Sequence, residues 1–342
     1  MDANWGLIGN ERAVGALQAC VASAANIHAY LLVGPEHTGR ALAAKRLAMA
    51  LNCTGVELPC GACTQCTRIE SGIHADVQTV TLDTEAEGAA RKSISVEQLR
   101  EVEKAVALAP YEGRTRVVTV DPAGLMSEAA QHSFLKTLEE PPPHAVFILI
   151  TANDEKLLET IRSRCTRIEF RLVPAAAIEE ALSARGIDPE RGRLLARLAG
   201  GRPGWAVGAA GDKKLFDRRS QHLERARSLP DMPLPERFDL AGRMSESFKR
   251  ERDPVLRQLD EWAGWWRDVL LVQSGAADSI SNIDETAAIN SDAARFVRKD
   301  VAQFVQVIVE TRGILGENVQ SRVALDALML AVPQPLRASA RR

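Results

Sequence analysis

A segment near the N-terminus has the residue types that hold a nucleotide phosphate. In the pattern G-x-x-x-x-G-K-[ST], backbone N–H groups surround the phosphates, the lysine reaches the β and γ phosphates, and the hydroxyl binds Mg²⁺. The corresponding residues here are Gly34-Pro35-Glu36-His37-Thr38-Gly39-Arg40-Ala41, after the apolar run 29–33. Gly34 and Gly39 are in register, so the backbone loop can form. Arg40 replaces the lysine with a planar fork that is not equivalent to an ammonium, and the methyl group of Ala41 cannot bind Mg²⁺.

The second half of such a site is an apolar strand that ends in Asp, followed by an acid that orients the attacking water. The segment "RVVTVDPAG" supplies the strand and Asp121, but the next residue is Pro122. Phosphoryl transfer depends almost wholly on positioning and electrostatics. Because the lysine, the hydroxyl and the second acid are all missing, we expect no ATP hydrolysis. Weak nucleotide binding stays open, since Arg40 and the loop amides are still donors.

Four of the six cysteines form a second candidate site. They have the spacing C-x6-C-x2-C-x2-C and are Cys53, Cys60, Cys63 and Cys66. Four thiolates at this spacing can close a tetrahedron around Zn²⁺, and a site made only of cysteines is a closed, structural one. A C-x-x-C redox pair would not need two further cysteines. The sequence therefore predicts a structural zinc module over 53–66.

The composition argues against a protein that binds nucleic acid by its own charge, spans a membrane or is secreted. The formal net charge is −2, which gives no electrostatic footprint for nucleic acid. No apolar run approaches the ~18 residues that cross a bilayer, and the first residues lack the features of a signal peptide. We therefore expect a cytoplasmic protein without membrane contact.

Short apolar segments and amphipathic segments alternate in the first half of the chain. The strand-like segments are 29–33, 77–82, 116–120, 145–150 and 166–170. A helix opens with the capping box Ser95/Gln98 and is expected to run until Pro110 stops it. Another helix begins at Ser127 and ends in "LEEPPP", where Glu139 and Glu140 are adjacent and so do not face each other as a catalytic pair. This alternation predicts a doubly wound α/β domain with its ligand crevice at the carboxyl ends of the strands.

The remainder of the chain reads as helical. Trp262, Trp265 and Trp266 recur at helical spacing in "LDEWAGWWRDVLL", which is typical of a core or a helix interface. The predicted organisation has three parts. They are an α/β domain over 1–171 that includes the cysteine module, a small helical lid domain over 172–208, and a helical collar or oligomerisation domain over 209–342.

Several motifs together resemble one family. They are "HAYLLVGP" (28–35), the cysteine cluster after the loop helix, "HSFLKTLEEPP" (132–142) and "SRC" (163–165). Their combination is similar to the bacterial clamp-loader subunits, which are AAA+ proteins of the DNA polymerase III holoenzyme. The resemblance covers residues 1–208 closely and the collar more loosely. The losses at Arg40, Ala41 and Pro122 resemble the family's delta-prime type, whose nucleotide site is degenerate, rather than its tau/gamma motor type.

The resemblance implies a role for Arg164 in "SRC". In the family this arginine projects toward ATP bound by a neighbouring subunit, where a guanidinium can neutralise charge that develops in the transition state. The resemblance further implies a stator in a ring with tau/gamma motor subunits and the delta subunit. That ring would load the sliding clamp onto primed DNA, with clamp and DNA contacted through the complex.

Two alternatives stay open at this point. The first is an active tau/gamma-like ATPase subunit, which purified chain that hydrolyses ATP would support. The second is a zinc-dependent nucleic-acid-binding protein, which DNA binding by the isolated chain with a steep salt dependence would support.

Overall fold

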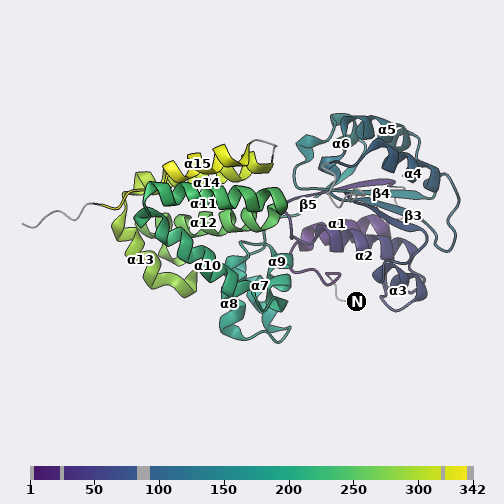
Figure 1. The fold of residues 1–342 in the computed structure, drawn as a ribbon. Helices are drawn as coiled ribbons and strands as arrows, with labels where there is room; N and C mark the ends of the chain where they lie inside the picture. Colours follow the sequence, from purple (N-terminus) through teal and green to yellow (C-terminus); the bar gives the residue numbers. More distant parts are fainter. Residues whose placement is uncertain (1–3, 24–26, 83–92, 317–319, 337–342) are drawn as a thin grey trace, which may run out of the picture. The chain divides into compact units, whose positions relative to one another are not determined.

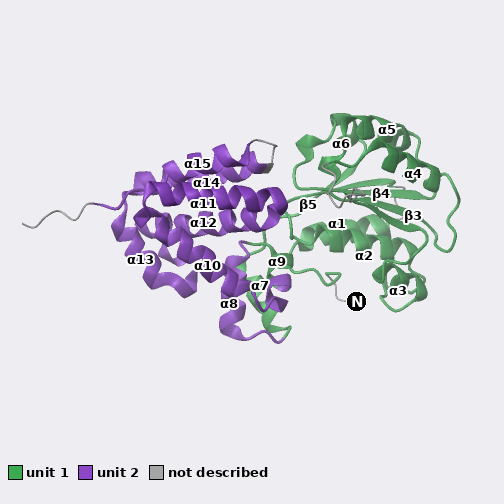
Figure 2. Cartoon of the chain, in the orientation of Figure 1, with its two compact units in different colours: residues 1–185, 201–206 green, residues 186–200, 207–342 purple. Residues whose placement is uncertain are grey.

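The computed structural model describes residues 4–23, 27–82, 93–316 and 320–336. The chain divides into two compact units (Figure 2). Unit 1 comprises residues 1–185 and 201–206, and unit 2 comprises residues 186–200 and 207–342.

Unit 1 is built on a five-stranded sheet with the order β2-β3-β4-β1-β5, in which every pairing is parallel. The strands are β1 Ala29–Val33, β2 Val77–Val80, β3 Arg116–Val120, β4 Ala145–Thr151 and β5 Thr166–Glu169. Strands β1 and β4 are buried along their whole length, as expected for central strands of a parallel sheet that is covered on both faces.

The two faces of the sheet carry separate cores because successive strand residues point to opposite sides. Tyr30 and Leu32 of β1 join the core under α1 and α2, whereas Leu31 and Val33 join the core under α4, α5 and α6. Figure 1 shows these two helical layers on either side of the sheet. The helices of unit 1 are α1 Glu11–Ala22, α2 Arg40–Asn52, α3 Thr64–Glu70, α4 Val96–Val106, α5 Glu128–Glu139, α6 Glu159–Arg162 and α7 Ala175–Ser183.

Two helices of unit 1, α4 and α5, begin at the caps that the sequence predicts. The predicted capping box is present: the Ser95 backbone N–H donates to the Gln98 side chain, and the Gln98 N–H donates to the Ser95 hydroxyl. The Ser127 hydroxyl likewise accepts from the Ala130 N–H at the start of α5. These bonds satisfy N–H groups that have no partner inside the helix.

Unit 2 is helical throughout its described residues. Its helices are α8 Pro189–Leu198, α10 Leu215–Ser228, α11 Leu234–Arg250, α12 Arg252–Gln273, α13 Thr286–Arg295, α14 Arg298–Gly316 and α15 Ser321–Leu330, and α9 Pro203–Gly211 spans the boundary with unit 1.

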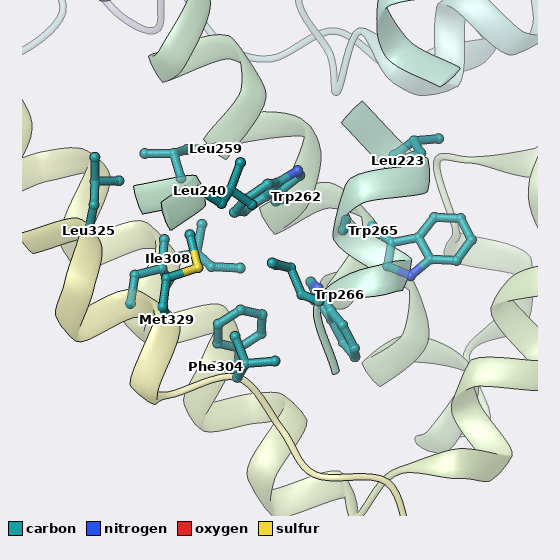
Figure 3. Packing of buried hydrophobic residues seen from close by; sticks show 14 of the residues in the cluster. Leu223, Leu240, Leu259, Trp262, Trp265, Trp266, Phe304, Ile308, Leu325 and Met329 are labelled. Carbon is teal, nitrogen blue, oxygen red and sulfur yellow. The ribbon is translucent and has the colours of Figure 1, made fainter. Parts of the chain in front are cut away.

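The core of unit 2 surrounds α12. Trp262, Trp265 and Trp266 are fully buried, as their helical spacing predicts. Figure 3 shows Trp266 beside Phe304 of α14, on the side of Ile308 and of Met329 of α15, whereas Trp265 lies on the side of Leu223. Phe304 meets the Trp266 ring edge-on at a centroid distance of 5.5 Å, a favoured geometry for aromatic pairs.

The predicted fold class, α/β followed by all-α, is confirmed. The three-part division at residues 171 and 208 stays a prediction. Among the described residues, no helix is both long and apolar enough to cross a bilayer.

Candidate functional site

The predicted phosphate loop joins β1 to α2 at the carboxyl end of a central strand. Gly34 has φ 151°, and a Cβ at this position would lie 2.1 Å from the backbone oxygen of Phe170. Only glycine fits this close approach. Gly39 ends the loop with φ 99° as the N-cap of α2. The Thr38 hydroxyl donates to the Pro35 carbonyl at 2.7 Å and so ties the loop across its middle.

Arg40 is the first residue of α2 and is 8% exposed. Its Nη1 is buried and has no hydrogen-bond partner among the described residues. Burial lowers the pKa of the guanidinium, while the negative charges of Asp121 and Glu36 oppose that shift. The loop therefore points a cationic donor inward, next to acidic groups of its own chain.

Asp121 directly follows β3, and its backbone N–H donates to the Val80 carbonyl at 3.0 Å. Burial raises the pKa of this carboxyl; Arg40 counteracts the shift, and Glu36 adds to it. The structure thus brings together Arg40 and Asp121, which lie far apart in the sequence. Pro122 follows and offers no carboxylate for a water.

Arg164 lies in the turn between α6 and β5. Its Nη2 is 2.6 Å from a carboxylate oxygen of Glu139, and its Nη1 donates to the Thr160 carbonyl at 2.9 Å. About a third of the side chain is exposed (34%). The neighbouring Cys165 is mostly buried, and burial raises its pKa to about 12, so this thiol remains protonated and packs against the core.

The four clustered cysteines converge in space. Their sulfurs all lie within 4.8 Å of one another. Tetrahedral coordination with Zn–S bonds of 2.3 Å would place sulfurs about 3.8 Å apart. In the structure, the sulfurs of Cys60 and Cys66 are 4.0 Å apart, and those of Cys63 and Cys53 are 3.9 Å apart. The donor set and its dimensions fit a metal ion such as zinc.

Backbone donors around the cluster favour thiolates at Cys60 and Cys63, whereas burial raises the pKa of Cys66. N–H groups of Gly55 and Cys60 point to the Cys53 sulfur, each at 3.3 Å, and the Cys63 N–H points to the Cys60 sulfur at 3.3 Å. Backbone donors from Ala62 and Cys63 lower the pKa of Cys60. Burial raises the pKa of Cys63, but donors from Thr54 and Cys66 outweigh it and lower the value to about 5. Since metals bind thiolates, this polarity suits a metal site.

A buried carboxylate supports the module and was not found from the sequence. Asp76 is 3% exposed and accepts three backbone N–H bonds of 2.7 to 2.8 Å from residues 111–113. Asn52, at the end of α2, accepts two more from residues 114 and 115. Together they fix the loop between α4 and β3 against the cysteine module, where Gln65 donates to the Glu112 carbonyl. No local pattern signals such bonds, because their donors are backbone groups distant in the sequence.

Comparisons with known proteins show what this chain is similar to. Residues 9–174 match the family model described as DNA polymerase III, delta subunit. The chain is 29% identical to the DNA polymerase III subunit delta′ of Bacillus subtilis, over 90% of this chain and 91% of that protein. It is 28% identical to the gamma/tau subunit of Mycobacterium tuberculosis, over 94% of this chain and 59% of that protein.

A solved structure from Thermotoga maritima is also similar. It is a DNA polymerase III gamma subunit-related protein, 16% identical, with a TM-score of 0.45; the match covers 92% of this chain and 97% of that one. By the family model over residues 9–174 and the similarity to delta′ over nine-tenths of both chains, this chain is similar to the clamp-loader subunits of DNA polymerase III.

Proposed function

We propose that this chain is the non-hydrolysing, delta-prime-type subunit of a DNA polymerase III clamp loader. It acts as a stator that helps the complex load the sliding clamp onto primed DNA. The protein would work in the cytoplasm, where bacterial chromosomes are replicated.

One observation carries the proposal: the two arginines that could serve ATP chemistry differ in their exposure to solvent. Arg40, in the phosphate loop, is buried beside Asp121 and Glu36, and the metal-binding hydroxyl is replaced by Ala41. Arg164 is partly exposed on a turn. This asymmetry supports a subunit without hydrolysis of its own that gives an arginine to a neighbour. Weak nucleotide binding remains compatible with the proposal, since Arg40 keeps an unpartnered donor.

The proposed partners rest on the similarity to clamp-loader subunits. We propose that the chain assembles with tau/gamma motor subunits and the delta subunit, and that its helical collar over 209–342 joins the ring. Contact with the clamp and with DNA comes through the complex. The formal net charge of −2 supports this indirect contact, because a protein that holds DNA alone needs a basic surface.

Arg164→Ala tests the proposal in the complex reconstituted with motor and delta subunits. An arginine finger contributes about 10³–10⁵ to the rate at the site it completes. We therefore expect the complex to assemble normally. Its DNA-dependent ATPase rate should fall by the part that the ATP site next to Arg164 contributes. Arg171→Ala is the matched control, since Arg171 is an exposed arginine of the same unit that pairs with Glu169. Unchanged ATPase in the Arg164 variant would refute the assignment.

We further propose that the four cysteines bind one structural Zn²⁺. The ion would hold residues 53–66 together and take no part in ATP chemistry, since four thiolates leave no open coordination position. Metal analysis of chain purified without chelator should give one zinc per chain. Chain with all four cysteines replaced by serine should give none.

Two alternatives give different results in simple assays. A tau/gamma-like motor predicts ATP hydrolysis by the purified chain, which the loss of three phosphate-site groups argues against. A zinc-dependent nucleic-acid-binding protein predicts DNA binding by the isolated chain with a steep salt dependence.

A further inference from the structure

The "LEEPPP" motif has a contact that the proposed function does not use. Its first glutamate, Glu139, is the last residue of α5, and Arg164 follows α6. The Glu139 carboxylate oxygen and the Arg164 Nη2 are 2.6 Å apart, a short, charge-assisted hydrogen bond. Arg164 Nη1 is held at the same time by the Thr160 carbonyl. Both terminal nitrogens of the guanidinium are therefore bound within this chain.

These bonds compete with the role proposed for Arg164. A guanidinium recognises phosphate through its planar fork of N–H donors, and here a carboxylate occupies part of that fork. A triphosphate that approached Arg164 would also meet the negative charge of Glu139, and like charges at close range repel. Arg164 can engage a phosphate fully only after it leaves Glu139.

The contact is suited to reversible release. Side-chain exposure is 34% for Arg164 and 51% for Glu139. Exposed ion pairs of this kind shift an equilibrium by no more than about fivefold. Such a contact biases the position of the arginine without locking it.

We propose that Glu139 holds Arg164 in a resting position and gives it up when a neighbour's nucleoside triphosphate arrives. This inference rests on the proposed function of Arg164. Glu139 is a positioning residue: it touches the arginine, not the nucleotide. The resting contact should weaken the apparent affinity for ATP, because it lowers the fraction of subunits whose Arg164 is free to bind the phosphate.

Glu139→Gln tests the proposal, because it removes the charge and keeps the shape. Steady-state ATPase is measured on the complex reconstituted with motor and delta subunits, with ATP and DNA varied. We expect KM for ATP to fall about two- to fivefold with kcat unchanged. The dissociation constant of a non-hydrolysable ATP analogue should fall by the same factor. Glu140→Gln, a charge change at the adjacent exposed residue, should alter neither quantity.

The Arg164→Ala background separates the two proposals. If Arg164→Ala alone leaves the ATPase unchanged, the proposed function of Arg164 fails. If it lowers the ATPase and Glu139→Gln still has an effect in that background, the resting contact is refuted while the finger stands. An unchanged KM in the single Glu139→Gln variant also refutes the resting contact, and so does a fall in kcat, which would make Glu139 an orienting residue for catalysis. The KM ratio of wild type to Glu139→Gln should shrink at high salt, because exposed charges are screened.

Discussion

The two compact units bury polar groups in different ways. In unit 1, Asp76 and Asn52 accept backbone N–H groups, so they fix the course of loops. In unit 2, buried Asp268 also accepts backbone N–H groups, from Ser281 and Asn282, but side chains are linked to one another as well. The Asn282 side chain donates to Asp268 and accepts from buried Arg219. Backbone anchoring places loops that carry chemistry, and functional residues concentrate on such loops. Side-chain pairing inside a helical core adds rigidity to a scaffold, which is what the proposed oligomerisation role of residues 209–342 needs.

Metal removal should produce the largest difference between the units. Structural zinc contributes an apparent ~10–16 kcal/mol in small zinc domains, and the cysteine segment has only the short helix α3 as regular structure. We expect chelation to raise hydrogen exchange across residues 53–70 and to leave α12 in unit 2 protected. Cys63→Ser should act like the chelator, whereas Cys20→Ser, outside the cluster, should not. Equal protection of 53–70 with and without chelator would contradict the metal site.

Asp76→Ala should have the next largest effect, also confined to unit 1. Its removal leaves three part-buried backbone N–H bonds without their acceptor, and each N–H group that water does not reach costs about 1–3 kcal/mol. We expect a loss of about 3–5 kcal/mol in the free energy of local opening around residues 110–115. Hydrogen exchange of that segment measures it, with Asp239→Ala in unit 2 as the control. A loss below about 1 kcal/mol would mean that water replaces the carboxylate.

The pH dependence of this effect has a definite sign. Burial raises the pKa of Asp76, but the backbone N–H bonds and Arg116 outweigh it, so the folded-state pKa lies below the usual value. Its contribution to stability is therefore full above the unfolded-state pKa of about 4 and is lost as pH falls through the folded-state pKa. The stability difference between wild type and Asp76→Ala should shrink in that acid range.

The sequence predicts the parts of the structure that local patterns determine, and it misses those that depend on contacts distant in the chain. All five strands, the capping box at Ser95 and the buried tryptophans were predicted, because local periodicity and capping chemistry determine them. Helix α4 was expected to continue to Pro110 but ends at Val106. The Ala109 carbonyl accepts the Arg116 side chain, and the residues after Pro110 bind Asp76. Those partners are distant in the chain, so local propensity could not reveal them.

In the candidate site, too, some features can be predicted from the sequence and others need the tertiary structure. The glycines, the cysteine spacing and the missing phosphate-site groups are visible in the sequence, because each depends on residue type at a fixed spacing. The pairing of Arg164 with Glu139, and the proximity of Arg40 to Asp121, depend on which helices and strands lie side by side. Neither could be predicted without the tertiary structure.

Trp265→Phe should have a smaller, clear effect in unit 2. The indole N–H of Trp265 donates to Asp292 at 3.2 Å, and burial raises the pKa of that carboxyl. Loss of the donor leaves the buried Asp292 carboxylate with one hydrogen bond fewer, which lowers the free energy of unfolding by about 1–3 kcal/mol at neutral pH. The cost should fall in mild acid, where the carboxyl of Asp292 becomes protonated and is easier to bury. Denaturant unfolding followed on α12 by hydrogen exchange measures both values.

Trp266→Phe should have the smallest effect, although Trp266 is as deeply buried as Trp265. Its indole N–H is buried and has no partner among the described residues, so phenylalanine removes an unsatisfied donor as well as apolar volume. The ring keeps its edge-on neighbours Phe296 and Phe304. We expect a loss of about 1 kcal/mol or less, because the relief of the unpaired donor offsets part of the cavity cost. A loss equal to that of Trp265→Phe would show that this N–H has a partner, such as a buried water, and that polar anchoring extends into the apolar centre of unit 2.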